Sequence, residues 1–418
     1  MDVVVAGQGY VGLPLAVRAA EVGHRVVGYD VDLNRIKRLI AGDSYVEDVA
    51  SSRLRAVLDT GAYSATADTA ALASFDIAVI TVPTPLRNGV PDLTYIETCA
   101  RTVGERLRPG ATVVLESTTY PGCTEELLLP ILEKTSGLKS GVDFLVGFSP
   151  ERIAPGNKRW SFDATPKIVS GIDAKSLEVI KGFYDGIFQT TVPVSGPRVA
   201  ELAKLLENTF RLVNISLVNE LATLTKALGV NAWEAIDAAA TKPFGFMRFT
   251  PGPGVGGHCL PVDPLFLSWK VEQELGVPFR FVNLADDVNR HMPDYVVQRV
   301  VDGLDKRGLP VKGSRILLLG LTYKYNATDL RNSPSGRIAE LLTDLGTEVR
   351  GADPNVPESD TSKLNMPRVD ASPQEVAAAD AVVLLMDHTR FDLAMIEKNA
   401  RYVLDCRNRL SGANVETL

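Results

Sequence analysis

The chain has 418 residues, 45% of them hydrophobic and 23% charged, which is enough for about two to three globular domains with separate cores. Its net charge of −7 and its scattered Lys and Arg residues leave no basic field, so we exclude nucleic acid as a partner. The apolar N-terminus lacks a basic leader and no apolar run approaches the roughly 18 residues of a membrane span. We therefore expect a cytoplasmic protein that has no membrane partner.

The N-terminal part alternates short β-branched runs with helical stretches, a pattern that predicts a doubly wound parallel sheet. The first runs are 2–7, 11–23 and 24–30, followed by 76–83 and 111–118. We predict a Rossmann domain over residues 1–195.

The sequence GQGYVG, from Gly7 to Gly12, follows the first strand and opens a helix. Asp30 ends the next strand, at the distance where an acidic residue accepts hydrogen bonds from a ribose. Gly7 permits the turn, Gly9 lets the backbone approach a pyrophosphate, and Gly12 lets helix and sheet pack closely. These residues predict NAD rather than NADP as the cofactor. The alternative is a glycine-rich turn without a ligand.

Two further strands end in polar segments, ESTTYPG and SPER. Since ligands bind at the carboxyl ends of such strands, we predict that Thr118 and Glu151 face the nicotinamide. Thr118 equally fits a turn, and Glu151 a cap or a surface charge.

One long helical period runs from Pro197 to about 228, with apolar residues three or four positions apart. We predict a helical central domain over 196–300 that forms a subunit contact. Lys204 and Asn208 lie on one face of this helix, where a cation and an amide can stabilise an oxyanion; a solvated surface pair is the alternative.

The segment PGPGVGGHCLPVDP, residues 251–264, contains four prolines and four glycines, so it is a loop that holds Cys259 in place. No Cys or His at metal-ligand spacing accompanies Cys259, and the four cysteines form no CxxC pair, so we predict reduced thiols and no metal. A nucleophile is a better assignment for Cys259 than a metal ligand or a core filler. Asp263 and Pro264 fit the N-cap and first turn of a helix whose partial positive charge favours a thiolate. The cap alone is the structural alternative for Asp263.

Strand and helix alternation returns near residue 301 and predicts a second Rossmann-like domain over 301–418. Ser333 and Pro334 fit the N-cap and first turn of its first helix. This domain has the single Gly320 at the strand end and lacks the fingerprint, so we assign it no dinucleotide. Lys324 and Arg331 are candidate phosphate ligands, or solvated loop cations.

Together these motifs resemble the nucleotide-sugar 6-dehydrogenase family, which includes the UDP-glucose, UDP-N-acetylhexosamine and GDP-mannose dehydrogenases. The resemblance covers essentially the whole chain. It rests on GQGYVG, VPTP, ESTTYPG, SPER, AKLLENTFR, GGHCLPVDP and GLTYKYNATDLRNSP, in that order.

The resemblance implies an NAD-dependent, two-step oxidation of a sugar primary alcohol to a uronic acid of polysaccharide biosynthesis, in a homodimer that binds a nucleotide-diphosphate sugar. Cys259 would form a thiohemiacetal and then a thioester. Lys204 and Asn208 would stabilise the oxyanions, Asp263 and Thr118 would order the water, and Glu151 would act as general base. The predicted cofactor-binding residues are Gly7, Gly9, Tyr10, Val11, Gly12, Asp30, Arg35, Thr84 and Thr118. The predicted substrate-binding residues are Glu151, Arg152, Lys204, Asn208, Arg248, Gly256, Lys324 and Arg331, with Arg248 reaching a neighbouring subunit's site.

His258 and Val262 beside the cysteine resemble the UDP-N-acetylhexosamine branch, whereas Ala154 and Arg248 depart from it. The predicted substrate is a UDP-N-acetylhexosamine or UDP-glucose, with a thymidine nucleotide sugar such as dTDP-glucose as an alternative. Two other classes stay open: a β-hydroxyacid dehydrogenase and a non-catalytic NAD-sensing regulator.

Overall fold

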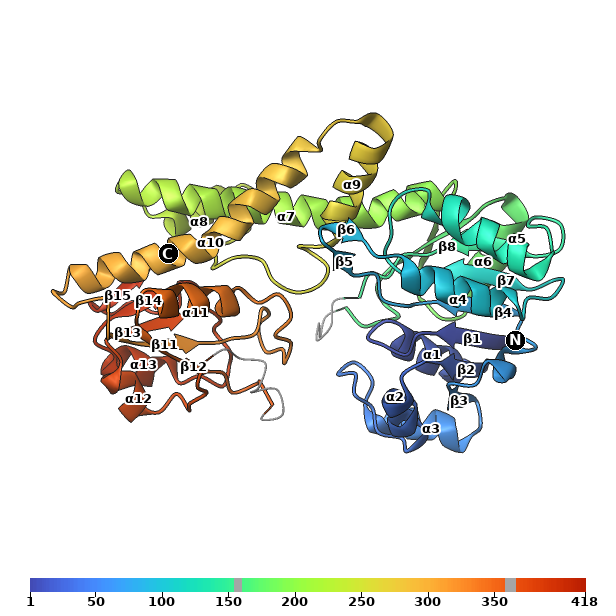
Figure 1. Ribbon diagram of the computed structural model, residues 1–418, viewed down its shortest axis with the longest axis horizontal. Coiled ribbons are helices and arrows are strands. Elements are labelled where there is room, and N and C mark those ends of the chain that lie inside the picture. Colours follow the sequence, from blue (N-terminus) through green and yellow to red (C-terminus); the bar gives the residue numbers. More distant parts are fainter. Residues whose placement is uncertain (154–159, 358–365) are drawn as a thin grey trace. The chain divides into compact units, whose positions relative to one another are not determined.

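The structure is a computed structural model that describes residues 1–153, 160–357 and 366–418. The chain forms two compact units, each built around its own sheet (Figure 1). Unit 1 comprises Met1–Glu207 and Leu265–Val277, and unit 2 comprises Asn208–Pro264 and Pro278–Leu418.

The large sheet of unit 1 has the strand order β10-β9-β8-β7-β4-β1-β2-β3 and is parallel except for the β8–β9 pair. Its strands are β1 (Asp2–Ala6), β2 (Arg25–Tyr29), β3 (Tyr63–Thr66), β4 (Ile77–Ile80), β7 (Thr112–Leu115), β8 (Leu145–Phe148), β9 (Lys167–Gly171) and β10 (Thr191–Pro193). Strands β5 (Leu86–Arg87) and β6 (Val90–Pro91) form a separate antiparallel pair. The central strands β4, β7 and β8 are buried throughout, as expected for a sheet that is covered on both faces.

Alternate residues of β1 enter two different cores, because successive side chains of a strand point to opposite faces. Val3 and Val5 belong to one hydrophobic cluster, Val4 and Ala6 to the other. The first core takes side chains from α1 (Gly12–Glu21), α2 (Leu33–Ile40), α3 (Ser51–Asp59) and α6 (Ala174–Asp185), and the second from α4 (Thr94–Gly104), the π-helical turn η2 (Thr124–Leu128) and α5 (Leu129–Ser136). A short 3₁₀ helix, η1 (Thr69–Leu72), precedes β4.

Unit 2 contains a five-stranded parallel sheet with the order β12-β11-β13-β14-β15. Its strands are β11 (Arg315–Leu319), β12 (Glu348–Ala352), β13 (Ala381–Leu384), β14 (Val403–Asp405) and β15 (Val415–Thr417). One face packs against α10 (Arg280–Asp305) and α11 (Pro334–Asp344), and the other against α12 (Pro373–Ala378) and α13 (Leu393–Asn399), as Figure 1 shows. Ser333 caps α11 and Pro334 occupies its first turn, so both predictions are confirmed.

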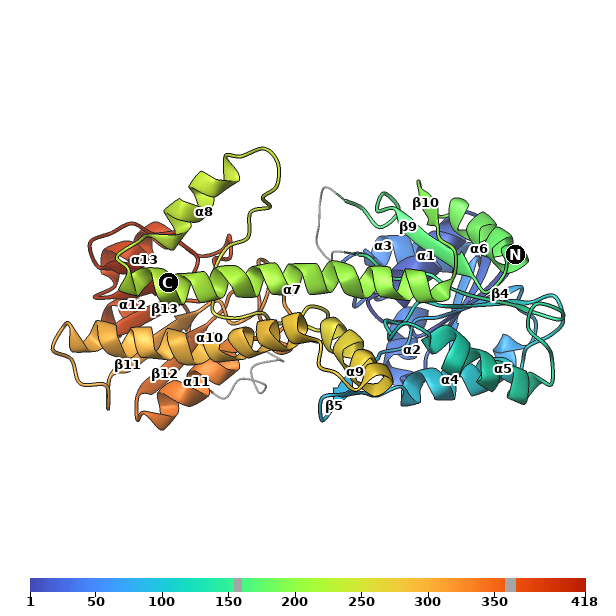
Figure 2. The same cartoon turned by 90° about the horizontal axis from the view of Figure 1, so that it is seen from above.

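The predicted long helix is α7 (Pro197–Ala227), which Figure 2 shows as one continuous element. The boundary between the two units falls within it, after Glu207. Helix α8 (Ala232–Ala240) follows, and α9 (Asp263–Leu275) comes directly after the cysteine-containing loop.

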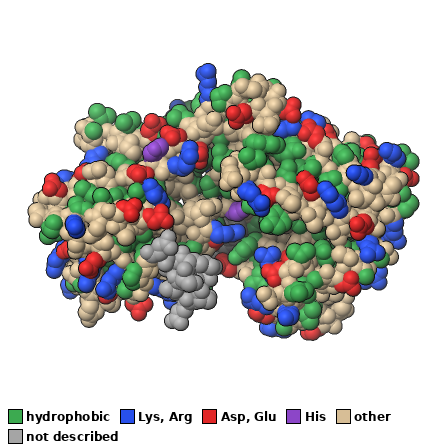
Figure 3. Space-filling view, viewed as in Figure 1, with side chains coloured by type: hydrophobic (Ala, Val, Ile, Leu, Met, Phe, Trp, Pro, Cys, Tyr) green, Lys and Arg blue, Asp and Glu red, His purple; other side chains and the backbone are tan. Residues whose placement is uncertain are grey.

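The predicted fold class, two doubly wound α/β domains with a long helix between them in the chain, is confirmed. Acidic and basic side chains are interspersed over the face of the molecule that Figure 3 shows. Among the described residues, no helix combines the length and the apolar character that crossing a membrane requires.

Candidate active site

The GQGYVG segment of unit 1 forms the tight turn between β1 and α1. Gly7 has φ +96°, and its N–H donates to the carbonyl of Tyr29 at 2.8 Å. A Cβ on Gly12 would lie 1.8 Å from the Gly7 carbonyl oxygen, so only glycine lets α1 begin this close to the strand. A Cβ on Gly9 would meet no heavy atom within 4 Å. The space beside Gly9 is therefore open, as a backbone that approaches a pyrophosphate requires.

Asp30 lies directly after β2 and is only 6% exposed. Its carboxylate accepts hydrogen bonds from the N–H groups of Gln8 at 2.8 Å and Asp32 at 2.9 Å. Arg35 contacts the same carboxylate at 3.3 Å. Asp30 is thus fixed beside the glycine turn, where it fits a ribose, and Arg35 lies next to it.

The loops after β4 and β7 leave the same edge of the sheet as the glycine turn, because Ala6 pairs with Ile80 and Ile80 with Leu115. The Ser117 hydroxyl donates to the carbonyl of Val82 at 2.7 Å and joins the two loops. The other predicted cofactor residues on this edge differ in exposure: Tyr10 is exposed, Val11 and Thr118 are half-buried and Thr84 is buried.

Glu151 follows β8 and is buried, with the N–H of Ile153 donating to its carboxylate. The ammonium of Lys167 lies 3.8 Å from Glu151 and 2.7 Å from Glu116. Burial raises the pKa of Glu151, and the charge of Glu116 acts in the same direction. Lys167 and Lys204 oppose that rise without cancelling it. Glu151 therefore holds its proton to a higher pH than an exposed glutamate, which suits a proton-transfer group.

Sequence reasoning missed the buried pair of Glu116 and Lys167. The Tyr184 hydroxyl donates to Glu116 at 2.5 Å, and the Lys167 ammonium lies over the rings of Tyr184 and Phe188. The available signal was one charged residue beside each apolar strand: Glu116 follows the strand in VVLEST, and Lys167 begins the strand in PKIVSG.

Arg152, a predicted substrate ligand, is held within unit 1. Its guanidinium contacts Glu207 at 2.5 Å and donates to the carbonyl of Pro166 at 2.7 Å.

Lys204 and Asn208 of α7 are buried, at 9% and 6% exposure, so the alternative of a solvated surface pair is wrong. Within unit 2, the Asn208 amide donates to the carboxylate of Asp263 at 2.6 Å. Asp263 is itself buried. The structure thus joins two of the predicted catalytic residues directly.

Cys259 is exposed, whereas the other three cysteines of the chain are buried; none of the four forms a disulfide, and all lie within the described residues. The Cys259 carbonyl accepts the N–H of Asp263 at 2.8 Å. Helix α9 begins at Asp263, so Asp263 is its first residue and not the predicted N-cap, and Cys259 precedes a helix N-terminus as expected.

Buried asparagines hold the irregular 251–262 loop. Asn219 accepts the N–H of Gly252 at 2.9 Å, and Asn289 accepts the N–H of Val255 at 2.5 Å. Sequence reasoning missed both residues, because each lies on a long helix without a local pattern. His258, beside the cysteine, is half-buried; burial lowers its pKa, the charge of Arg331 lowers it further, and Asp329 opposes them.

The remaining predicted residues of unit 2 belong to three loops. Lys324 is half-buried and Arg331 is exposed, with its guanidinium 2.7 Å from Asp329. Arg248 is exposed and pairs with Asp237 at 2.7 Å. Gly256 packs against the side chain of Tyr323, which a Cβ would approach to 2.5 Å. Ala154, whose identity bears on the sugar, lies outside the described residues.

Three family descriptions match the chain in order. The NAD binding domain of the UDP-glucose/GDP-mannose dehydrogenase family matches residues 1–188, its central domain residues 198–291 and its UDP binding domain residues 317–412.

Relatives match over nearly the full length. The chain is 36% identical over 414 residues to UDP-N-acetyl-D-mannosamine dehydrogenase of Pyrococcus horikoshii, covering 98% of this chain and 96% of that protein. It is 38% identical over 395 residues to UDP-N-acetyl-D-glucosamine 6-dehydrogenase of Pseudomonas aeruginosa, covering 94% and 91%. A solved structure of the UDP-D-ManNAc dehydrogenase from Pyrococcus horikoshii is similar with a TM-score of 0.91 at 34% identity, over 100% of this chain and 98% of that chain.

The open space at Gly9 gives a direct test of the cofactor site. Gly9→Ala places a methyl group where no protein atom lies within 4 Å, so we expect unchanged thermal stability. The same methyl group blocks the approach of the pyrophosphate, and we expect NAD affinity to fall about tenfold or more, which corresponds to about 1.4 kcal/mol. Calorimetric titration with NAD measures this. Gly182→Ala, equally free of neighbours, is the matched control; equal NAD affinity in both variants contradicts the assignment.

Proposed function

Because this chain belongs to the UDP-glucose/GDP-mannose dehydrogenase family and is an NAD-dependent UDP-sugar dehydrogenase, we propose that it oxidises C6 of a UDP-N-acetylhexosamine to a carboxylate through a covalent adduct on Cys259. The observation that carries this proposal is an exposed cysteine at a helix N-terminus, in a chain whose full length resembles dehydrogenases of such sugars.

A thiolate at Cys259 is supported by its position. The partial positive charge at the N-terminus of α9 favours a negative sulfur, and the bond from the Asp263 N–H to the Cys259 carbonyl fixes the distance between residue and helix. The exposed side chain leaves the sulfur accessible to a substrate carbonyl.

The chemistry requires two oxidations at one carbon. The first converts the primary alcohol to an aldehyde; the Cys259 thiolate then adds to the aldehyde carbon, and the resulting oxyanion takes a proton to give a thiohemiacetal. The second oxidation removes the hydrogen of that carbon and gives a thioester. Water cleaves the C–S bond, which releases the carboxylate and regenerates the thiolate. NAD, when bound, accepts a hydride in each of the two oxidations.

Other residues of the chain have distinct roles in this scheme. We assign Lys204 and Asn208 to the oxyanions, since both are buried donors on one face of α7. We assign Asp263 and Thr118 to ordering the water that hydrolyses the thioester, and Asn208 orients Asp263. Glu151 removes its proton, a role that its raised pKa supports.

Gly7, Gly9, Gly12 and Asp30 would hold the cofactor. The open space at Gly9 fits the pyrophosphate, and the fixed carboxylate of Asp30 fits the adenosine ribose. In this proposal the other cofactor-binding residues line the same edge of the sheet: Tyr10, Val11, Arg35, Thr84 and Thr118.

The nucleotide sugar engages Lys324 and Arg331 through its phosphates, with Arg152, Arg248 and Gly256 as further ligands. The names of the relatives support an N-acetylhexosamine over glucose, and a uridine over a thymidine nucleotide. A β-hydroxyacid dehydrogenase is disfavoured by the match to the family's UDP binding domain.

A panel of nucleotide sugars tests substrate and stoichiometry together. We expect a UDP-N-acetylhexosamine to give two NADH per sugar and an acid as product, because the aldehyde stays bound until the second oxidation. One NADH per turnover with a keto product points to the hydroxyacid class, and no turnover with any nucleotide sugar points to a regulator.

Cys259→Ala should abolish acid formation while NAD binding persists, whereas Cys99→Ala, at a buried thiol, should retain turnover. Unchanged acid formation in Cys259→Ala excludes the covalent role.

The buried charges around Glu151 predict a pH effect. A general base works only as the carboxylate, so turnover should fall as the pH drops through the raised pKa of Glu151. Lys167→Met removes a charge that lowers this pKa, so the acid limb of the pH–rate profile should move to higher pH. Lys167→Arg keeps the charge and should leave the limb in place. A limb that does not move in Lys167→Met contradicts the assignment of Glu151.

A homodimer is part of the proposal. Helix α7 exposes a row of apolar side chains that recur at helical spacing: Val199, Leu202, Leu206, Phe210, Leu217, Leu221 and Leu224. We infer that a second copy covers this row, because a contiguous apolar stripe is costly in water.

Leu217→Asp should shift the protein to a monomer in analytical ultracentrifugation, because a carboxylate would be buried in the contact. Leu275→Asp, at an exposed leucine of α9 outside the row, is the control. A dimer that persists in Leu217→Asp at micromolar concentration excludes this surface.

A further inference from the structure

The turn after β11 in unit 2 has the same hydrogen bonding as the glycine turn after β1 in unit 1. The Gly320 N–H donates to the carbonyl of Ala352 at 2.9 Å, as that of Gly7 donates to Tyr29. Asp353 follows β12 as Asp30 follows β2, and its carboxylate accepts the N–H of Leu321 at 2.7 Å. Unit 2 therefore has, in Asp353, an acidic residue at the position equivalent to Asp30, which we assign to the ribose.

The carboxylate of Asp353 has a different partner, however. Its side chain is 0% exposed and lies 3.1 Å from Nε2 of His388, which is also 0% exposed. Burial by itself raises the pKa of Asp353, but the hydrogen bonds from His388 and from the backbone of Asn355 and Thr322 outweigh it, and the pKa lies below its usual value. Asp353 is a buried anion that binds His388 instead of a ligand.

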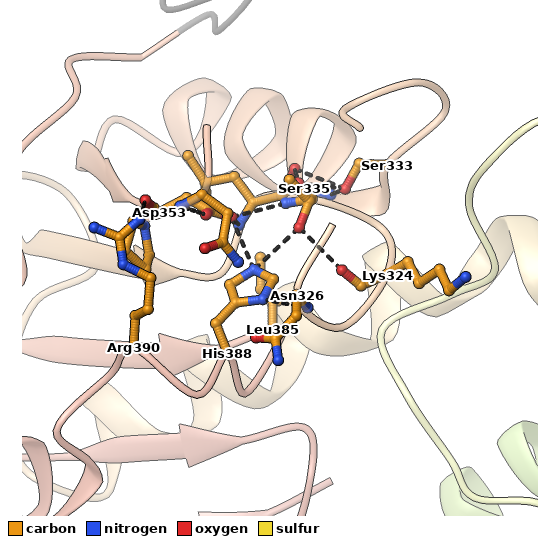
Figure 4. A network of polar contacts seen from close by, with 12 residues as sticks. Lys324, Asn326, Ser333, Ser335, Asp353, Leu385, His388 and Arg390 are labelled. Carbon is orange, nitrogen blue, oxygen red and sulfur yellow. Dashed lines mark hydrogen bonds and ion pairs between the residues drawn. The ribbon is translucent and has the colours of Figure 1, made fainter. Parts of the chain in front are cut away.

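His388 in turn binds the loop that follows β11. Its Nδ1 accepts the backbone N–H of Asn326 at 2.9 Å, and Nε2 lies 3.0 Å from the Thr322 hydroxyl. That hydroxyl donates to the carbonyl of Lys324 at 3.3 Å. Figure 4 shows the imidazole between Asp353 and this loop, with the side chain of Lys324 extending away from the network.

The hydrogen bonds define one tautomer. Because Nδ1 accepts an N–H, it carries no proton, and the single ring proton is on Nε2, where it faces the Asp353 carboxylate. The imidazole thus joins the Asp353 carboxylate to the backbone of the loop.

A second clamp acts on the same loop. Asn326 adopts a left-handed conformation with φ +55°, and its side-chain oxygen accepts the N–H and the hydroxyl of Thr389 at 3.0 and 3.1 Å. The segments 321–326 and 388–389 are therefore bound together on both sides of Lys324.

The far end of the 321–332 loop contacts the cysteine loop within unit 2. The Gly257 N–H donates to the carbonyl of Arg331 at 3.0 Å, and the Asn332 amide donates to the carbonyl of Gly257 at 3.0 Å. A Cβ on Gly257 would lie 2.5 Å from the ring of Tyr323. Gly257 is two residues from Cys259, so the 321–332 loop joins the segment with Lys324 to the segment with the nucleophile.

We propose that His388 is a positioning residue: by anchoring the 321–332 loop to Asp353, it sets the place of Lys324 relative to the Cys259 loop and so determines the affinity for the uridine diphosphate group. The proposal rests on the proposed function, in which Lys324 binds the nucleotide sugar.

The anchor is strong because the Asp353 carboxylate and the His388 imidazole at its base are both 0% exposed. Loss of the imidazole removes one partner of the Asp353 carboxylate, which keeps the N–H groups of the backbone around it, and leaves the Asn326 N–H without its acceptor. The loop can recover these hydrogen bonds only by moving, and Lys324 moves with it.

Calorimetric titration of the full-length protein with UDP tests this directly. We expect His388→Leu to weaken UDP binding about tenfold, because the contacts of the ring to Asp353, Thr322 and the Asn326 N–H are all lost. His388→Asn, whose side-chain oxygen can accept the Asn326 N–H, should recover part of the affinity. NAD affinity should stay unchanged in both variants, because the NAD residues belong to unit 1, and in turnover the loss should appear in KM for the nucleotide sugar and not in kcat.

Asn326→Gly tests the same anchor without altering the core. Glycine adopts the left-handed conformation easily, Asn326 is exposed, and only the contacts to Thr389 are lost. We expect weaker UDP binding, by a smaller factor than in His388→Leu. Asn408→Gly is the matched control, since Asn408 is also exposed and left-handed, with φ +54°.

Wild-type UDP affinity in both His388→Leu and Asn326→Gly would overturn the proposal, as would an equal loss of NAD affinity. If His388→Leu does not fold, Asn326→Gly decides alone. A wild-type protein that does not bind UDP would instead overturn the ligand assignment made for Lys324, and with it the proposal.

Discussion

The function that we propose depends on holding one exposed sulfur, that of Cys259, at a fixed place in a segment that forms no regular structure. Glycine and proline keep residues 251–262 out of helix and strand, so the position of Cys259 depends on contacts from elsewhere. The bond from Asp263 to the Cys259 carbonyl ties the sulfur to α9, and Asn219 and Asn289 hold the preceding backbone. In the mechanism that we propose, Cys259 stays bonded to the substrate through two oxidations, and this requires such a fixed position.

The same kind of contact recurs across the chain: buried polar side chains fix the irregular segments that contain the proposed catalytic and binding residues. Asn208 orients Asp263, Lys167 and Glu116 lie against Glu151, and the His388 pair anchors the 321–332 loop. An unpaired buried polar group is costly. Each of these contacts therefore strongly favours one conformation of its segment over alternative conformations in which the contact is broken. Rigidity at the functional segments therefore comes from long-range polar contacts, while the apolar cores stabilise the sheets beneath them.

The sequence predicts the parts of this molecule that have a local pattern. Strand and helix alternation predicts both sheets, GQGYVG predicts the turn after β1, and Ser333 with Pro334 predicts the start of α11. Long-range pairs have no such pattern. The partner of a buried charge such as Glu116, or of His388, is chosen by which strand ends the topology brings together. For the same reason the sequence left Lys204 and Asn208 open as surface residues, whereas tertiary packing buries them.

The central claim is that the substrate stays bonded to Cys259 between the oxidations. The most direct measurement is peptide mass spectrometry of Glu151→Gln protein quenched during turnover with NAD and a UDP-N-acetylhexosamine, since removing the base should slow thioester hydrolysis. Our account predicts that the peptide with Cys259 carries the mass of the acyl sugar nucleotide and that the peptides with the buried cysteines do not. Accumulation of the acid with Cys259 unmodified throughout would contradict it.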